Sequence, residues 1–109
     1  MTKNVLFVCS QNALRSPTAE QVFSDWPGIE VSSAGLNNDA HNPLTDEQVG
    51  WADIIFVMER SQRNRLSKKF RRSLKARVAV LGIPDDYDFM DPELVRLLEA
   101  RVPPFLPRT

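Results

Sequence analysis

The chain alternates short strand-like segments with segments of helical periodicity, and this order restricts the folds that it can adopt. The run Val5–Val8 is continuously apolar, which is typical of a strand buried on both faces of a sheet. Three further short segments predict strands at residues 29–33, 54–58 and 78–81. This pattern predicts an α/β domain, with a small four-stranded, mostly parallel sheet that has helices on both faces.

The segments between these strands have helical spacing or helix-start signals. The expected apolar helix faces are Ala19, Val22, Phe23 and Trp26, and, in a helix over residues 60–75, Leu66, Phe70 and Leu74. Thr45 and Gln48 resemble a capping box that opens a brief helix. Asp91-Pro92 predicts the start of a last helix, because an acid caps the first turn and proline tolerates its first position.

Length and composition predict one domain over residues 1–109. The formal net charge is zero, so no overall field attracts the chain to nucleic acid or to a membrane. A single cysteine permits no internal disulfide, and no apolar run is long enough to cross a bilayer. We therefore expect a cytoplasmic protein.

Residues 9–16 have the chemistry of a phosphate-binding loop between a strand and a helix. Cys9 ends the first strand, and Arg15 follows six residues later, beside Ser16-Pro17. In parallel sheets ligands bind beyond the carboxyl ends of the strands, where loop amides and a helix N-terminus attract anions. The same field favours a thiolate on Cys9, and the guanidinium of Arg15 suits two phosphate oxygens.

The loop residues Ser10, Gln11, Asn12, Ala13 and Leu14 are expected to bind the phosphate through their amides. Asn12 tolerates the left-handed backbone that such a turn requires. Ser16 is placed to cap the following helix and to donate to the thiolate. The alternative is that Cys9 is a small apolar core residue, but the surrounding pattern favours the phosphate site.

The segment Val5–Glu20, with Cys9, Asn12, Arg15, Ser16 and Pro17 in their places, resembles the signature of the low molecular weight protein tyrosine phosphatases. Ser33-Ala34-Gly35 and residues 52–59 are similar to the family's next two strands. The resemblance implies hydrolysis of phosphomonoesters, with protein phosphotyrosine favoured, through a cysteinyl-phosphate on Cys9. It implies no metal and no other cofactor.

The family takes a general acid from an Asp-Pro-Tyr loop after the fourth strand. Here the loop contains Asp85, Asp86 and Tyr87, so the resemblance assigns Asp85 as the acid and Tyr87 to the pocket rim. Asp91-Pro92 is a competing match, although its helix-start chemistry explains it without catalysis. Asp86 is a third alternative, and the loop could also be only an acidic, solvated segment.

Two departures from the family bear on the substrate. Leu14 stands where members commonly have a second cysteine, which removes a protective disulfide within the loop. Only sixteen residues separate Gly35 from Ala52, so the wall of the pocket is shortened and the site is expected to be more open. His41 lies in this shortened segment, where a single exposed histidine more often has no role.

Residues 60–77 include nine of the fourteen cationic side chains: Arg60, Arg63, Arg65, Lys68, Lys69, Arg71, Arg72, Lys75 and Arg77. A solvated helix face is the favoured interpretation, and a patch for nucleic acid or an acidic partner is the alternative. An arsenate reductase would need further cysteines, and Arg15 with Asp85 argues against a phosphocysteine carrier. The remaining alternative is a non-catalytic phosphate- or RNA-binding module.

Overall fold

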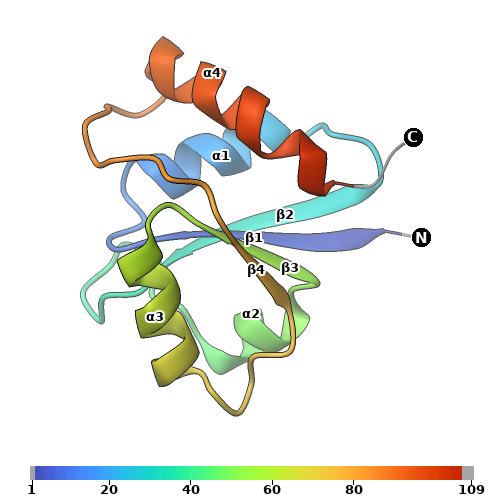
Figure 1. Cartoon of the computed structure of the whole chain (residues 1–109), viewed down its shortest axis with the longest axis vertical. Helices are drawn as coiled ribbons and strands as arrows, with labels where there is room; N and C mark the ends of the chain where they lie inside the picture. The colour runs from blue at the N-terminus through green and yellow to red at the C-terminus, as the bar shows by residue number, and fades with distance from the viewer. Residues whose placement is uncertain (1, 107–109) are drawn as a thin grey trace.

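The computed structural model describes residues 2–106, in which four parallel strands form one sheet in the order β2-β1-β3-β4. Figure 1 shows the sheet between two layers of helices. The elements are the strands β1 (Lys3–Cys9), β2 (Ile29–Gly35), β3 (Ile54–Val57) and β4 (Arg77–Val80), the helices α1 (Arg15–Phe23), α2 (Asp46–Trp51), α3 (Arg60–Lys69) and α4 (Pro92–Arg101), and the short 3₁₀ helix η1 (Pro103–Phe105). The predicted α/β architecture with helices on both faces is confirmed.

The central strand β1 separates two apolar cores, because its side chains alternate between the faces. Phe7 packs under α1 and α4 with Phe23 and Phe56, at ring-centroid distances of 5.8 and 5.3 Å. Leu6 points to the opposite face, where α2 and α3 cover the sheet and Leu66 is fully buried. Two-sided burial explains why the run Val5–Val8 is continuously apolar.

Two predicted helices end earlier in the structure than their apolar spacing indicated. α1 ends at Phe23, and Trp26 lies beyond it with its ring 5.3 Å from that of Phe23. α3 ends at Lys69, and the amides of Ser73 and Leu74 both donate to the Phe70 carbonyl in a turn. An apolar side chain one turn past a helix end can reach the same core, so spacing alone overestimates helix length.

The helix caps confirm two predictions and correct a third. Thr45 and Gln48 form the expected capping box at α2, and the Asp91 carboxylate accepts a 2.9 Å hydrogen bond from the Glu93 amide at the start of α4. Ser16 is not a cap: α1 begins at Arg15 after Leu14, with no side-chain cap. Among the described helices, none is long and apolar enough to cross a membrane.

Candidate active site

The loop between β1 and α1 surrounds a cavity at the carboxyl edge of the sheet. β1 ends in Cys9, and the neighbouring strand β3 leads into Glu59 at the same edge. Parallel strands bring their carboxyl ends together, so segments distant in the sequence meet here. The cavity has a volume of about 170 Å³ and is lined by Cys9, Ser10, Gln11, Ala13, Leu14, Arg15 and Asp85.

Cys9 is buried, and within residues 2–106 its sulfur has one polar partner, the hydroxyl of Ser16, with 2.9 Å between Sγ and Oγ. The Asn12 amide donates to the same hydroxyl oxygen over 2.9 Å. The Ser16 hydroxyl can accept from Asn12 and still donate its hydrogen to the sulfur, because a hydroxyl has one donor and two acceptor sites. The contact has the geometry that the predicted donor role of Ser16 requires, and that role stays a prediction.

The backbone of the loop is held from outside by the segment after β2. The carbonyls of Cys9, Ser10 and Gln11 accept hydrogen bonds from the amides of Leu36, Asn37 and His41, at 2.9, 2.9 and 3.0 Å. In a trans peptide the N–H points opposite to the carbonyl, so the amides of Ser10, Gln11 and Asn12 are turned the other way. Asn12 adopts the predicted left-handed conformation, with φ of 56°.

Gly35 allows this outer segment to approach so closely. A Cβ on Gly35 would lie 2.5 Å from the Ala40 Cβ and 2.8 Å from the Ser10 carbonyl oxygen. Both distances are shorter than van der Waals contact, so a side chain there would push the two segments apart. His41 has an exposed side chain and contributes its backbone amide to this contact.

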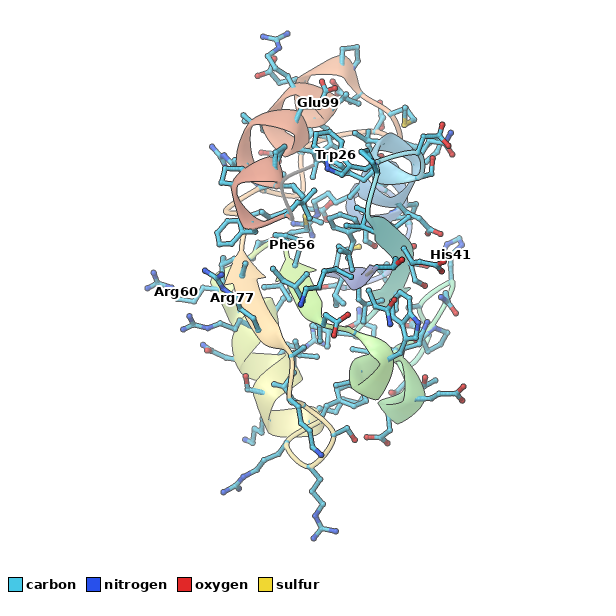
Figure 2. All side chains as sticks on the ribbon, turned by 90° about the vertical axis from the view of Figure 1, so that its right-hand side faces the viewer. Trp26, His41, Phe56, Arg60, Arg77 and Glu99 are labelled. Atoms are coloured by element: carbon cyan, nitrogen blue, oxygen red, sulfur yellow. The ribbon has the colours of Figure 1, made fainter. Side chains whose placement is uncertain are left out.

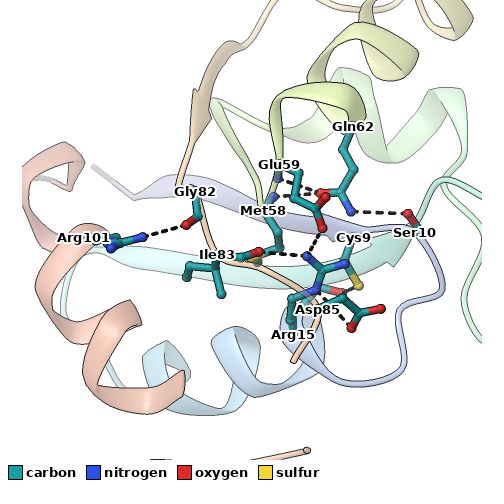
Figure 3. A network of polar contacts seen from close by, with 11 residues as sticks. Cys9, Ser10, Arg15, Met58, Glu59, Gln62, Gly82, Ile83, Asp85 and Arg101 are labelled. Carbon is teal, nitrogen blue, oxygen red and sulfur yellow. Dashed lines mark hydrogen bonds and ion pairs between the residues drawn. The ribbon is translucent and has the colours of Figure 1, made fainter. Parts of the chain in front are cut away.

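Arg15 is buried at the first position of α1, and three groups hold its guanidinium (Figure 3). Nη1 donates to the Glu59 carboxylate over 2.5 Å and to the Ile83 carbonyl over 2.9 Å. Nε lies 3.6 Å from the Asp85 carboxylate. These contacts fix the plane of the guanidinium before any phosphate binds, which lowers the ordering cost of binding.

The roles of Glu59 and Gln62 were not predicted from the sequence. Glu59 caps α3, and the Gln62 side chain accepts from the amides of Met58 and Glu59 and donates 3.3 Å to the Ser10 hydroxyl (Figure 3). A capping-box pattern directly after a buried strand was the available signal. It could reveal the helix start, although not the contacts with Arg15 and Ser10.

The three candidate acids in the segment after β4 lie in different places relative to the cavity. Asp85 lines the cavity with a side chain that is 67% exposed, whereas Asp91 caps α4 and is outside the cavity lining. Asp86 is exposed and also outside that lining. Tyr87 is half-buried against the apolar core under α1 and α4, rather than among the cavity residues. The structure therefore brings together the predicted loop residues, Arg15 and Asp85, but not Tyr87.

Comparison with known proteins shows which proteins this chain resembles. The family model described as low molecular weight phosphotyrosine protein phosphatase matches residues 4–51, which include the entire loop and Gly35. Over these residues, which are less than half of the chain, the sequence is similar to this phosphatase family. A curated relative from Ralstonia nicotianae, named "Probable low molecular weight protein-tyrosine-phosphatase EpsP", is 26% identical over 141 residues, covering 99% of this chain and 97% of the relative.

Solved phosphatase structures share the fold. The YwlE arginine phosphatase from Geobacillus stearothermophilus superposes with a TM-score of 0.71 at 23% identity, over 89% of this chain and 88% of that one. The tyrosine phosphatase AmsI from Erwinia amylovora gives 0.74 at 21% identity, over 93% and 89%. The tyrosine phosphatase Wzb from Escherichia coli K30, in complex with phosphate, gives 0.71 at 21% identity, over 93% and 94%. The predicted phosphatase-like fold is confirmed.

Proposed function

We propose that the protein hydrolyses phosphomonoesters through a covalent phosphate on Cys9. The observation that most supports this is the position of the Cys9 sulfur, with the Ser16 hydroxyl on one side and the cavity on the other. A thiolate there faces both the turned amides of the loop and the fixed guanidinium of Arg15. The similarity of residues 4–51 to the phosphatase family model supports the same chemistry.

In the first step the Cys9 thiolate attacks phosphorus in line with the leaving oxygen. A bond forms between sulfur and phosphorus while the bond from phosphorus to the ester oxygen breaks. The amides of Ser10, Gln11 and Asn12, together with Arg15, bind the three equatorial oxygens, whose charge is redistributed in the transition state. Asp85 gives its proton to the leaving oxygen, a contribution of typically ~10²–10⁴-fold.

In the second step water replaces sulfur on phosphorus. Asp85, now ionised, accepts a proton from the attacking water, and the thiolate of Cys9 leaves with its electron pair. The Ser16 hydroxyl stabilises this thiolate in both the free enzyme and the departing state. The exposure of Asp85 supports its role, because a carboxyl group at the open end of the cavity can reach both the leaving group and water.

We further propose that the substrate is a phosphorylated side chain of a cytoplasmic protein, with phosphotyrosine favoured. A cavity of about 170 Å³ has room for a phosphoryl group, and the group that bears it would then lie at the open mouth. The short segment between Gly35 and α2 supports a shallow mouth. The similarity to both tyrosine and arginine phosphatases makes phosphoarginine the necessary comparison substrate.

The test is turnover of para-nitrophenyl phosphate by the wild type and by Cys9→Ser, followed by phosphotyrosine and phosphoarginine peptides. We expect turnover that vanadate inhibits and that Cys9→Ser abolishes. A wild-type protein that binds phosphate but hydrolyses no aryl phosphate would contradict the proposal. That result would favour a phosphate-binding module instead.

A further inference from the structure

The positive and negative charges of the chain lie in different parts of the sequence, although the net charge is zero. Residues 60–77 contain nine cations and no acid, so the remaining residues, with five cations and fourteen acids, have a net charge of −9. All nine cations are exposed, and none of them forms an ion pair with another of the described residues. An exposed cationic segment without acidic partners remains free to bind an anionic one.

Part of this segment forms a stripe that begins at the active site. Gln62, Arg65 and Lys69 follow at i, i+3 and i+7, so they lie along one face of α3. Gln62 donates to Ser10 in the phosphate loop, and Arg65 contacts the side-chain oxygen of Asn37 over 2.5 Å. The face of α3 therefore continues directly from the wall of the catalytic cavity.

The partners of these cations are neutral, so their charge is not compensated. Lys69 donates to the Leu36 carbonyl over 3.2 Å and to the Asn38 side-chain oxygen over 2.9 Å. Amide oxygens orient an ammonium or guanidinium group without cancelling its charge. The cations are thus held in place and still attract anions.

The stripe ends in a shallow hollow of about 310 Å³ beside α2, lined by Asp46, Lys68, Lys69, Phe70, Arg71 and Arg72. Four of these side chains are cationic and one is acidic, and the Asp46 carboxylate accepts a hydrogen bond from the Ser73 hydroxyl. We call Arg65, Lys68 and Lys69 on α3, together with Arg72 in the turn that follows the helix, the α3 basic stripe.

We propose that the α3 basic stripe binds acidic residues that flank the phosphorylated residue of a protein substrate. This inference rests on the proposed phosphatase function and assigns its substrate class: acidic phosphoprotein segments. Gln62 and Lys69 are about 10 Å apart along the helix axis, at ~1.5 Å per residue. An extended peptide covers that distance in about three residues, at ~3.3 Å each. The acidic residues are therefore expected about two to five positions from the phosphorylated one.

The test compares two double variants with the same change of charge. Lys68→Gln/Arg72→Gln removes two charges from the stripe, and neither side chain forms a hydrogen bond or ion pair within residues 2–106. Arg60→Gln/Arg63→Gln removes two charges from the opposite face of α3, closer along the chain to the active site. Figure 2 shows Arg60 extending away from the side on which His41 lies. If the cations acted only by long-range attraction of the acidic peptide, the control would lose more of that attraction than the stripe variant. If the peptide docks on the stripe, only the stripe variant would lose its binding.

The substrates are two phosphotyrosine peptides. The acidic peptide has Asp and Glu two to five positions from the phosphotyrosine on either side, and the neutral peptide has Asn and Gln at the same positions. For the wild type we expect kcat/KM to be about tenfold higher with the acidic peptide, a preference that declines with salt. The stripe variant should lose most of this preference through KM, and the control should keep it. Both should hydrolyse para-nitrophenyl phosphate as the wild type does.

The inference would be overturned if the wild type had equal kcat/KM for the two peptides. It would also be overturned if the stripe variant and the control lost the preference for the acidic peptide to the same extent. Either result would leave the proposed function intact. If the wild type hydrolyses nothing, the proposed function fails and the inference is decided by binding alone, measured by fluorescence anisotropy with Cys9→Ser protein. Tighter binding of a twelve-residue oligouridine than of the acidic phosphopeptide, abolished in the stripe variant, would overturn it in favour of RNA.

Discussion

The guanidinium of Arg15 lies 2.5 Å from the carboxylate of Glu59, and this pair joins the start of α1 to the N-cap of α3. The two residues are 44 positions apart in the sequence. Glu59 is 42% exposed on its side chain, whereas Arg15 is buried. The contact with Glu59 therefore fixes the position of the Arg15 guanidinium at the cavity.

Removal of this carboxylate should weaken phosphate binding. In Glu59→Gln we expect kcat/KM for para-nitrophenyl phosphate to fall about tenfold, because a fixed charge-assisted contact is replaced by a weaker one. The inhibition constant of inorganic phosphate should rise in parallel. The matched control is Glu93→Gln, which removes the exposed 3.3 Å pair with Arg96. Equal activity in the two variants would argue against a positioning role for Glu59.

Replacement of the two candidate acids should separate chemistry from stability. Asp85→Asn should lower kcat by ~10²-fold or more for phenyl phosphate, and less for para-nitrophenyl phosphate, whose leaving group needs little protonation. Asp91→Ala should leave kcat unchanged and cost about 1 kcal/mol through the lost helix cap, measured by denaturant unfolding. Loss of activity in Asp91→Ala at full stability would reverse the assignment.

The Ser16 hydroxyl should affect the reactivity of the nucleophile. In Ser16→Ala the sulfur loses its donor and the Asn12 amide loses its acceptor, so we expect slower alkylation of Cys9 by iodoacetamide at neutral pH. The decrease in kcat should be about a hundredfold, the lower end of the ~10²–10³-fold range for loss of one hydrogen-bond donor at an active site. Ser67→Ala, on the exposed face of α3, is the control and should match the wild type.

Gly35 and Gly50 should respond to alanine in opposite directions. Gly35→Ala should cost about 1–3 kcal/mol and weaken phosphate binding, because its Cβ would overlap Ala40 and the Ser10 carbonyl. Gly50→Ala in α2 meets no atom within 4 Å and should stabilise the protein by about 0.5–1 kcal/mol. Thermal unfolding and phosphate titration measure both effects. Adding Ala40→Gly should partly rescue Gly35→Ala, and a Gly35→Ala protein with unchanged stability would refute the packing argument.

The sequence by itself determined the elements and the centre of the chemistry. Val5–Val8 predicted a doubly buried strand, Asp91-Pro92 a helix start, and the spacing of Cys9 and Arg15 a loop at the tip of that strand. These features are local, since backbone periodicity, capping and loop amides depend on residues a few positions apart. Where local spacing was extended too far, as at Trp26 and Leu74, it overestimated the helices.

Only the tertiary structure decided how the site is supported. The contacts of Arg15 with Glu59 and Ile83 span 44 and 68 residues, and the segment after Gly35 orients the loop carbonyls from outside. The same long-range packing separated Asp85, at the cavity, from Asp91, at a helix cap. Such contacts depend on which strands lie side by side and how closely their loops approach. Residue spacing alone does not specify those distances.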